Sequence, residues 1–421
     1  MFRAQICAFV GLVLMLVAAP TGAREVQFSL ENRLGGNSNV FRANEGSSID
    51  EEPDGFWEIL PRLALSDTGG DLIYQFHYQP SYEQYFTQEN ISGLDHAADG
   101  ASTWRLSPAD RLEMSGAFRS SRRLSQEIGD PGLLDPALEP SDGERVKRGE
   151  GSFAYSRQIS PVLVARLGFG TTDVDYSERT RSDSRAFSTS VGATYVLNQR
   201  STVGATLAGR WRNSRVNQEF GPVVLREIRS DSDTLDLSFL LSRRVSPSVS
   251  LTVRVGPSVI FTEQEVQPSE FASSSSTSFD DSTVDVSVFA NASLQKTFRK
   301  GQANLTYMRF ESGGGGSVGS TIVDDLSFQV VRRWDRLWST RFFAGWSRRT
   351  NVGNTVGSQD TEVVGWRVIG SVARRLNEKL SLVGRFLWRR QGDEKSSGAG
   401  DRNENLIGSI ALQYEFDPIS F

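Results

Sequence analysis

The chain has 421 residues, one Cys, two His, a formal net charge of −5 and a hydrophobic fraction of 38%. So few His and Cys residues exclude most metal sites, and the acidic balance argues against a nucleic-acid partner, which would need a basic face. The mean hydropathy of −0.34 and the lack of an apolar run of about 20 residues exclude a helical membrane protein. A membrane β-barrel is not excluded, because its strands alternate between two faces and average out as polar.

The first 23 residues have the pattern of a cleaved signal peptide. Arg3 supplies the positive charge, Ile6–Ala19 is an apolar run of 14 residues, and Thr21–Ala23 is a small-residue cleavage site. An uncleaved anchor is the less favoured alternative, because the run is too short for a full span. We expect a mature chain that starts at Arg24 and lacks Cys, because Cys7 leaves with the signal peptide.

From Arg24 onward, apolar residues recur at every second position, which is the period of a half-buried β-strand. The pattern is clear in four segments, where apolar and polar side chains fall on opposite faces: 203–212, 249–262, 284–295 and 380–389. No stretch keeps a helical period. We therefore predict an all-β fold for residues 24–421, as one domain.

Short and long connections alternate along this train of strands. Tight-turn residues occur at eight places: Asp67–Gly70, Ser107–Asp110, Ser160–Pro161, Asn198–Arg200, Ser246–Ser248, Arg299–Gly301, Trp334–Asp335 and Asn377–Glu378. Longer polar stretches lie between them, for example Gln126–Arg145, Glu263–Asp281, Gly313–Gly319 and Gln391–Asn403. With terminal strands at Val26–Arg33 and Leu406–Phe416, the pattern predicts about 18 strands in a transmembrane antiparallel up-and-down barrel, with short periplasmic turns and long external loops.

A soluble β-sandwich would show the same alternation of faces, but it requires neither so many strands nor such regular connections. The aromatic residues also favour the barrel. They fall toward strand ends on the apolar face, where an interfacial girdle would place them: Trp57, Tyr74, Tyr78, Trp104, Tyr155, Tyr195, Trp211, Tyr307, Trp346, Trp366, Trp388 and Tyr414.

The C-terminal segment resembles the signal by which the outer-membrane assembly machinery recognises its clients. Ile410, Leu412, Tyr414 and Phe416 alternate with polar or small residues, and the chain stops at Phe421. Because Asp417 and Pro418 interrupt the alternation, two arrangements stay open. Either Phe416 is the terminal aromatic of the signal and a five-residue tail follows it, or the strand bends.

The segment Leu34–Arg42 after the first strand, with Ile59–Leu63, Leu72–Tyr78 and the strand-turn-strand units Leu241–Pro247 and Val372–Leu380, resembles a family of outer-membrane β-barrel porins. Members of that family are associated with exopolysaccharide and exosortase (PEP-CTERM) gene clusters. The resemblance implies a passive conduit in the outer membrane of a Gram-negative bacterium, with outer-membrane lipid, lipopolysaccharide and polysaccharide export components as partners.

If the apolar faces contact lipid, the opposite faces place a set of arginines in the lumen: Arg119, Arg166, Arg210, Arg212, Arg254, Arg341, Arg367, Arg385 and Arg389. Inward carboxylates are fewer, with Glu113, Asp236, Asp285 and Glu415 the clearest. Seven arginines are the candidate anion path, because guanidinium groups bind carboxylates and sulfates: Arg166, Arg210, Arg254, Arg341, Arg367, Arg385 and Arg389. The alternative is structural, since porin walls also use arginines in ion pairs that hold the shape of the barrel.

Enzyme function is not indicated. His77 falls mid-strand and His96 falls in or near an external loop with Asp95 and Asp99, and neither has a nucleophile motif or metal-ligand spacing beside it. Three hypotheses follow: an anion-selective or exopolysaccharide channel, a non-conducting scaffold or adhesin that acts through its external loops, and a barrel enzyme, which we expect to be wrong. No cofactor or metal is expected.

Overall fold

The computed structural model describes residues 24–39, 52–122, 145–177, 183–220, 223–268, 279–312, 320–352, 362–393 and 402–420. The predicted signal peptide, the predicted loop Gly313–Gly319, nearly all of Gln126–Arg145 and the final Phe421 lie outside these ranges. No helix in the described residues is both long and apolar enough to cross a membrane.

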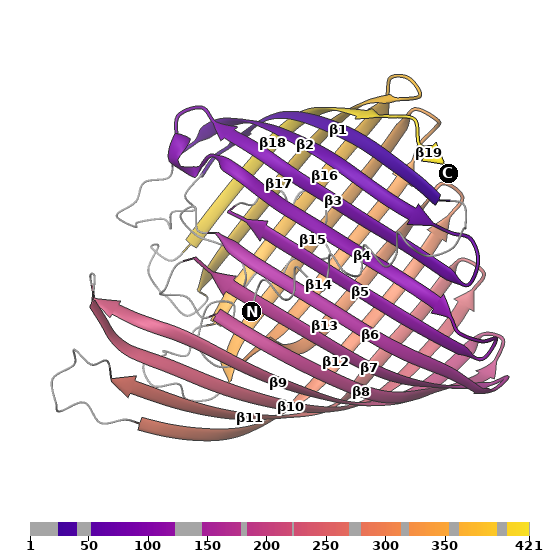
Figure 1. The fold of residues 1–421 in the computed structure, drawn as a ribbon, viewed down its shortest axis with the longest axis vertical. Coiled ribbons are helices and arrows are strands. Elements are labelled where there is room, and N and C mark those ends of the chain that lie inside the picture. Colours follow the sequence, from indigo (N-terminus) through magenta and orange to yellow (C-terminus); the bar gives the residue numbers. More distant parts are fainter. Residues whose placement is uncertain are drawn as a thin grey trace.

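Eighteen antiparallel strands form a closed ring (Figure 1), because each strand pairs with its sequence neighbours and β1 pairs with β18. The prediction of an up-and-down barrel is therefore confirmed. The strands are β1 (Arg24–Asn37), β2 (Asp54–Asp67), β3 (Leu72–Tyr85), β4 (Gly93–Arg105), β5 (Asp110–Ser121), β6 (Val146–Ser160), β7 (Leu163–Tyr176), β8 (Asp183–Asn198), β9 (Ser201–Phe220), β10 (Val223–Ser246), β11 (Val249–Pro268), β12 (Phe279–Phe298), β13 (Gly301–Ser312), β14 (Ser320–Arg333), β15 (Trp338–Val352), β16 (Glu362–Arg375), β17 (Leu380–Asp393), β18 (Arg402–Glu415) and the outlying β19 (Ile419–Ser420). One short 3-10 helix, η1 (Glu89–Ile91), follows β3.

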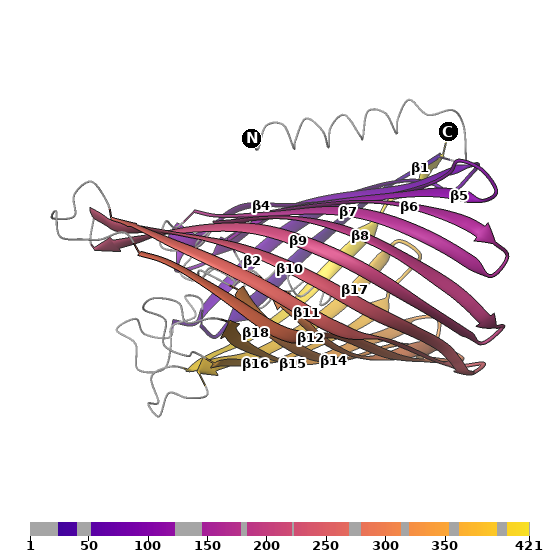
Figure 2. The same ribbon diagram turned by 90° about the horizontal axis from the view of Figure 1, so that it is seen from below.

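All eight predicted tight turns join consecutive strands at one end of the barrel, which we call the turn end. Gly70 takes the positive φ of 77° that its turn requires. At the opposite end, the loop end, strands extend further than the sequence suggests. The predicted loop Glu263–Asp281 begins and ends within β11 and β12, and Gln391–Asn403 overlaps β17 and β18. Only residues 221–222 separate β9 from β10, and the long strands β9–β12 together extend beyond β8 and β13 at the loop end (Figures 1 and 2).

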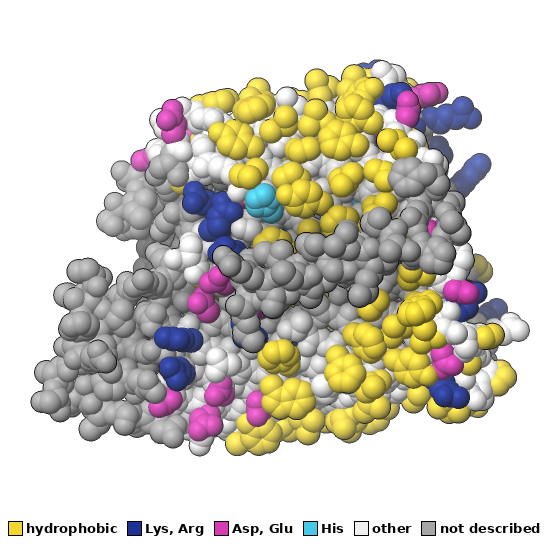
Figure 3. Space-filling model, viewed as in Figure 1, with side chains coloured by type: hydrophobic (Ala, Val, Ile, Leu, Met, Phe, Trp, Pro, Cys, Tyr) yellow, Lys and Arg dark blue, Asp and Glu magenta, His cyan; other side chains and the backbone are white. Residues whose placement is uncertain are grey.

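The two faces of the wall differ as the alternation predicts. Exposed side chains of the outer face are apolar, such as Val286 at 77% and Ile410 at 63% exposure, and they form a broad band with charged side chains toward its two ends (Figure 3). Trp104, Trp211 and Trp366 of the predicted girdle are exposed on this face, whereas Tyr74 is buried. Such a band is the surface that a lipid bilayer covers.

The strand bends near its C-terminal end and then continues. β18 ends at Glu415, and Ile419 of β19 pairs with Val26 of β1. The Phe416 ring contacts the rings of Phe28, with centroids 5.0 Å apart, and Tyr414, with centroids 4.7 Å apart. Of the two arrangements left open by the sequence, the structure has the bent strand.

Candidate transport lumen

All nine arginines predicted to face inward lie on the inner face of the wall. Each arginine lies an even number of positions from buried or lumen-lining residues of the same strand, so it is on the same face as they are. The intervening positions carry the exposed apolar side chains. The four predicted inward carboxylates also lie on that face: Glu113, Asp236, Asp285 and Glu415. The structure does not bring these residues together into one path, because they line different cavities: Arg119, Arg341 and Arg385 line one, Arg210 and Arg212 a second, and Arg367 and Arg389 a third.

A cavity of about 470 Å³ lies in the lumen between strands β1–β5 and β14–β18. We call it the basic chamber. Five arginines line it, together with two carboxylates, the ring of His77 and uncharged side chains. The charged lining residues are Arg33, Arg62, Arg119, Arg341, Arg385, Glu31 and Asp99. An excess of fixed positive charge in a confined aqueous space attracts anions.

Two of these arginines belong to a cross-strand network that the sequence did not reveal. Arg385 binds Glu31 through both guanidinium nitrogens, at 2.5 and 2.7 Å. Arg33 contacts Glu31 at 2.8 Å and the fully buried Glu58 at 2.7 Å. Bidentate guanidinium–carboxylate pairs fix side-chain positions, so Arg33 links β1 to its neighbour β2, and Arg385 links β17 to β1 across the intervening β18.

The other three chamber arginines differ. Arg62, Arg119 and Arg341 form no ion pair with any described residue. Arg62 and Arg341 are exposed to the lumen and Arg119 is half-buried. Asp99 contacts His77, with Oδ2 3.0 Å from Nδ1. These three guanidinium groups are therefore available to a solute in the chamber.

The remaining candidate arginines have separate surroundings. Arg166 contacts Glu113 at 2.7 Å. Arg367 lies 5.0 Å from the ring centre of Phe343, and Arg389 donates to Gln391 at 3.4 Å; both arginines are nearly buried. Arg254 lies half-buried on the inner face of β11 without an ion pair in the described chain.

An apolar belt crosses the inner wall at the level of Arg367 and Arg389. It follows direct cross-strand pairs and continues over Gly35, whose Cα is covered by the Phe56 ring. The members of the belt are at most 7% exposed: Phe343, Ile369, Leu387, Ile407, Phe56, Tyr85 and, from η1, Ile91. These side chains are shielded from solvent, whereas wall side chains of a wide aqueous pore would be exposed to water.

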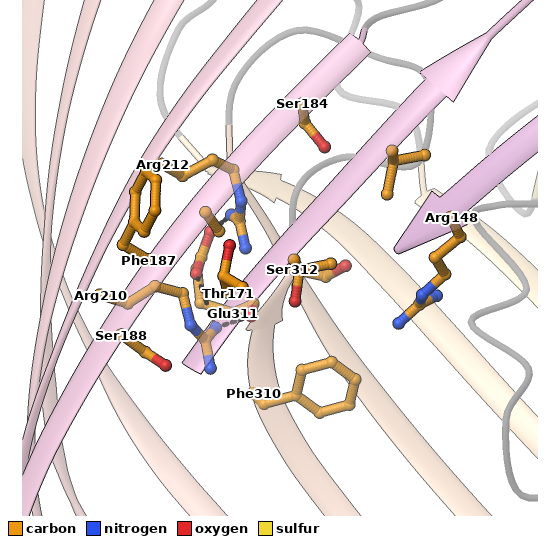
Figure 4. Close-up of a pocket in the computed structure, with 13 residues that line it drawn as sticks. Arg148, Thr171, Ser184, Phe187, Ser188, Arg210, Arg212, Phe310, Glu311 and Ser312 are labelled. Atoms are coloured by element: carbon orange, nitrogen blue, oxygen red, sulfur yellow. Dashed lines mark hydrogen bonds and ion pairs between the residues drawn. The ribbon is translucent and has the colours of Figure 1, made fainter. Parts of the chain in front are cut away.

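A second internal contact spans non-neighbouring strands (Figure 4). Glu311 near the end of β13 binds Arg210, at 3.2 Å, and Arg212, both from β9, and Thr234 of β10 donates to it at 3.3 Å. The Glu311 side chain is 3% exposed. A cavity of about 240 Å³ adjoins it, into which Arg148 also projects. We call Arg210, Arg212 and Glu311 the inner clasp.

His96 is near the β3–β4 loop, as predicted, and is the fourth residue of β4. Its position in the alternation of β4 puts its side chain on the outer face. It stacks on Tyr78 with an interplanar angle of 13°, and its Nδ1 lies 3.0 Å from the Tyr78 hydroxyl. His77 is on the inner face, as predicted.

Sequence reasoning missed the carboxylates that neutralise the arginines. Glu31 and Glu58 do follow the inward alternation of β1 and β2, so that pattern was available. Glu311 gave no such signal, because the alternation along β13 assigns its position to the outer face. Its inward placement depends on how the end of the strand bends.

Comparisons with known proteins give distant structural similarities only. No family model and no curated protein matches the chain. Among solved structures, the chain is similar to the ferric-catecholate import receptor Fiu of E. coli K12 in its closed form, with a TM-score of 0.49, 8% identity, and coverage of 94% of this chain and 82% of that one. The siderophore receptor PiuA from Acinetobacter baumannii gives a TM-score of 0.48 at 10% identity, with coverage of 94% and 82%. The outer membrane protein OpdK from Pseudomonas aeruginosa gives 0.41 at 14%, with coverage of 94% and 99%.

Proposed function

We propose that this protein is an outer-membrane channel that conducts anionic solutes through the basic chamber. A closed barrel with an apolar outer band is suited to a bilayer, and its lumen offers a polar route across that bilayer. The observation that carries the proposal is that Arg62, Arg119 and Arg341 line the chamber without an ion-pair partner among the described residues. Arginines that only stabilised the wall would form ion pairs with carboxylates, as Arg33 and Arg385 do.

Single-channel recording in planar bilayers tests this proposal. We expect the purified barrel to conduct with a preference for chloride over potassium. Changing Arg62, Arg119 and Arg341 together to Gln should lower the chloride-to-potassium permeability ratio at least twofold, because the fixed charge of the chamber is removed. The matched control changes the turn residues Arg200, Arg299 and Arg336 to Gln, which alters net charge equally but outside the chamber. An equal drop in both variants would contradict the assignment.

The narrower proposal concerns the solute. The resemblance to exopolysaccharide-associated porins and the guanidinium lining both suit a polymer that bears carboxylates, held weakly at several points. A short polygalacturonate added to one side should interrupt the ionic current, whereas dextran of the same length should not. The block should disappear in the triple Gln variant. Equal block by both sugars would leave only a size effect.

A second candidate function is a non-conducting scaffold or adhesin. The buried apolar belt and the inner clasp favour it, because an open pore would leave their side chains exposed to water. This reading predicts no measurable conductance from a barrel that migrates as folded, unheated protein. Conductance that is anion-selective and lost in the triple variant would exclude it.

A further inference from the structure

A group of basic and aromatic side chains lies on the outer surface at the turn end, around β14–β16. We call it the turn-end cluster, and its members are Lys300, Arg332, Trp334, Trp338 and Arg374. Arg332 lies four positions from the outward Phe328 on β14, and Phe328 is 40% exposed. Arg374 lies two positions from the outward Val372 on β16, which is 45% exposed. Alternation therefore places both arginines on the outer face, where the apolar band ends.

Ring contacts and one hydrogen bond link the members of the turn-end cluster. The Arg332 guanidinium lies 4.0 Å from the ring centre of Trp334, and the Arg374 guanidinium lies 5.3 Å from the ring centre of Trp338. The Lys300 ammonium donates to the main-chain carbonyl of Trp334 at 2.6 Å. Because β15 lies between β14 and β16, the two arginines project from strands about 10 Å apart. Stacking on an indole occupies the face of a guanidinium and leaves the N–H groups at its edge free to donate.

The turn-end cluster has an excess of positive charge. Its three cations are exposed, and none of them forms an ion pair with any described residue. The β14–β15 and β16–β17 turns contain one carboxylate each, from Asp335 and Glu378. Asp335 accepts from the backbone N–H groups of Leu337 and Trp338 at 2.7 Å, and Glu378 forms no ion pair with the cluster. Such an excess of fixed positive charge attracts anions.

The surroundings of the cluster favour a lipid headgroup as the anion. Toward the middle of the barrel the cluster adjoins the apolar band, where the rings of Phe328 and Phe342 meet edge to face with centroids 6.5 Å apart. Trp334 and Trp338 are 50% and 39% exposed, as is typical of indoles at the boundary between hydrocarbon and water. Basic side chains at this boundary attract acidic lipids, by about 1 kcal/mol for each Lys or Arg near the surface.

We propose that the turn-end cluster binds the headgroup of an acidic phospholipid in the adjoining leaflet, with the phosphate between Arg332 and Arg374. The acyl chains of this lipid lie along Phe328 and Phe342. A headgroup with a net negative charge, such as that of phosphatidylglycerol, is attracted by the excess of positive charge. In phosphatidylcholine the trimethylammonium group cancels the charge of the phosphate, so the same site binds it more weakly. The site lies on the outer surface and does not depend on ion conduction through the basic chamber.

Lipid-specific quenching tests this site in the folded barrel. Val372 is an outward residue two positions before Arg374, and Leu241 is an outward residue, 41% exposed, two positions before the exposed Arg243 of β10. Bimane is attached to Val372→Cys or to Leu241→Cys, and each protein is placed in phosphatidylcholine vesicles with a small fraction of brominated phosphatidylglycerol or of brominated phosphatidylcholine. We expect phosphatidylglycerol to quench the Val372 label about threefold more than phosphatidylcholine does, and the two lipids to quench the Leu241 label nearly equally. Equal quenching of the Val372 label by both lipids would overturn the proposal, and it is the result expected if the cluster instead binds an acidic soluble protein.

Variants that remove charge test which side chains select the lipid. Arg332→Gln/Arg374→Gln should lower quenching of the Val372 label by phosphatidylglycerol to the phosphatidylcholine level. The matched control, Arg157→Gln/Arg243→Gln, removes two exposed outward charges of the turn end from β6 and β10 and should keep the preference. An equal loss in both variants would assign the attraction to overall charge and overturn the site. Ion selectivity of the cluster variant in planar bilayers should match that of the unaltered barrel, so a failure of the channel and a failure of the lipid site are observed separately.

Discussion

At the scale of single residues, the inner wall contains arginines that form ion pairs with carboxylates and arginines that form none with any described residue. Burying an ion requires a partner, because transfer of an unpaired charge from water is highly unfavourable. Arg33 and Glu58 satisfy that requirement at 4% and 0% side-chain exposure. Arg62 and Arg341 stay exposed to the lumen instead. Exposure thus separates arginines that stabilise the wall from those that can meet a solute.

Glu58→Ala should lower the free energy of unfolding by about 3–5 kcal/mol, because Glu31 alone must then neutralise both Arg33 and Arg385, which leaves one positive charge without compensation in a buried site. Urea titration of the detergent-solubilised barrel, followed by the shift between folded and unfolded gel mobility, measures the loss. Glu113→Ala is the control, since Glu113 and its partner Arg166 are largely solvated, at 34% and 58% side-chain exposure. It should change stability by no more than about 1 kcal/mol.

Gly35 should not tolerate a side chain. A Cβ there would lie 2.5 Å from the Phe56 ring and 2.6 Å from the Gly408 carbonyl oxygen, whereas at the adjacent Gly36 the nearest atom is 3.9 Å away. We expect Gly35→Ala to destabilise the barrel by about 1–3 kcal/mol through overpacking. Gly36→Ala, measured in the same urea titration, should be close to neutral. Equal losses of stability in the two variants would mean that the loss comes from the changed backbone flexibility of the strand and not from the contact with Phe56.

At the scale of elements, the tight turns depend on single side-chain acceptors. Asp335 accepts from the backbone N–H groups of Leu337 and Trp338, both at 2.7 Å. Asn377 makes the equivalent bonds to Lys379 and Leu380, at 2.9 and 2.8 Å. The two turns have the same geometry, but only one acceptor can be protonated.

The β14–β15 turn should therefore open in acid while the β16–β17 turn does not. Hydrogen bonds from the Trp338 and Leu337 amides lower the pKa of the Asp335 carboxyl. A lowered folded-state pKa means that this stabilisation is present above the unfolded value and is lost as pH falls through the folded value. Amide exchange between pH 5 and 2, corrected for intrinsic rates, should show falling protection at Trp338 but constant protection at Leu380. Asp335→Asn should remove the difference.

The last strands provide a second prediction at this scale. Phe416 contacts both Phe28 and Tyr414, and its backbone N–H donates to the Phe28 carbonyl at 3.0 Å. Phe416→Ala should lower the folded fraction recovered from membranes several-fold, because it removes ring contacts at the point where β18 meets β1. Phe28→Leu is a milder comparison that keeps an apolar contact. Normal recovery of the Phe416 variant would show that these contacts do not limit assembly.

At the scale of the whole molecule, the register between β1 and β18 closes the ring. Leu34 faces Ile410 directly, and both are well exposed on the outer surface. Because the predicted mature chain lacks Cys, a Leu34→Cys/Ile410→Cys pair should form one defined disulfide on oxidation. It should stabilise the barrel by roughly 2–4 kcal/mol. The control pair Leu34→Cys/Leu412→Cys is two residues out of register and should stay reduced on a non-reducing gel.

The sequence predicts most of the architecture but only part of the lumen. Alternation reports which face a residue occupies, and that is why all nine inward arginines are placed correctly. Pairing depends on which strands are adjacent and on their register, so the ion pair between Glu31 and Arg385, which spans the intervening β18, could not be identified from β1 or β17 alone. The bend at Glu311 and the outer-face position of His96 also depend on long-range geometry. Local turn chemistry, in contrast, located all eight tight turns.

The β1–β18 pairing joins the first and last strands of the ring, and this affects the rate at which the ring closes. Ser29 lies beside Glu415 and Val26 beside Ile419, so the contacts that complete the ring have nearly the largest sequence separation the chain allows. Closing so large a loop is slow and loses much chain entropy. Until β18 pairs with β1, the sheet has two unpaired edges, and edges of this kind can pair with other chains.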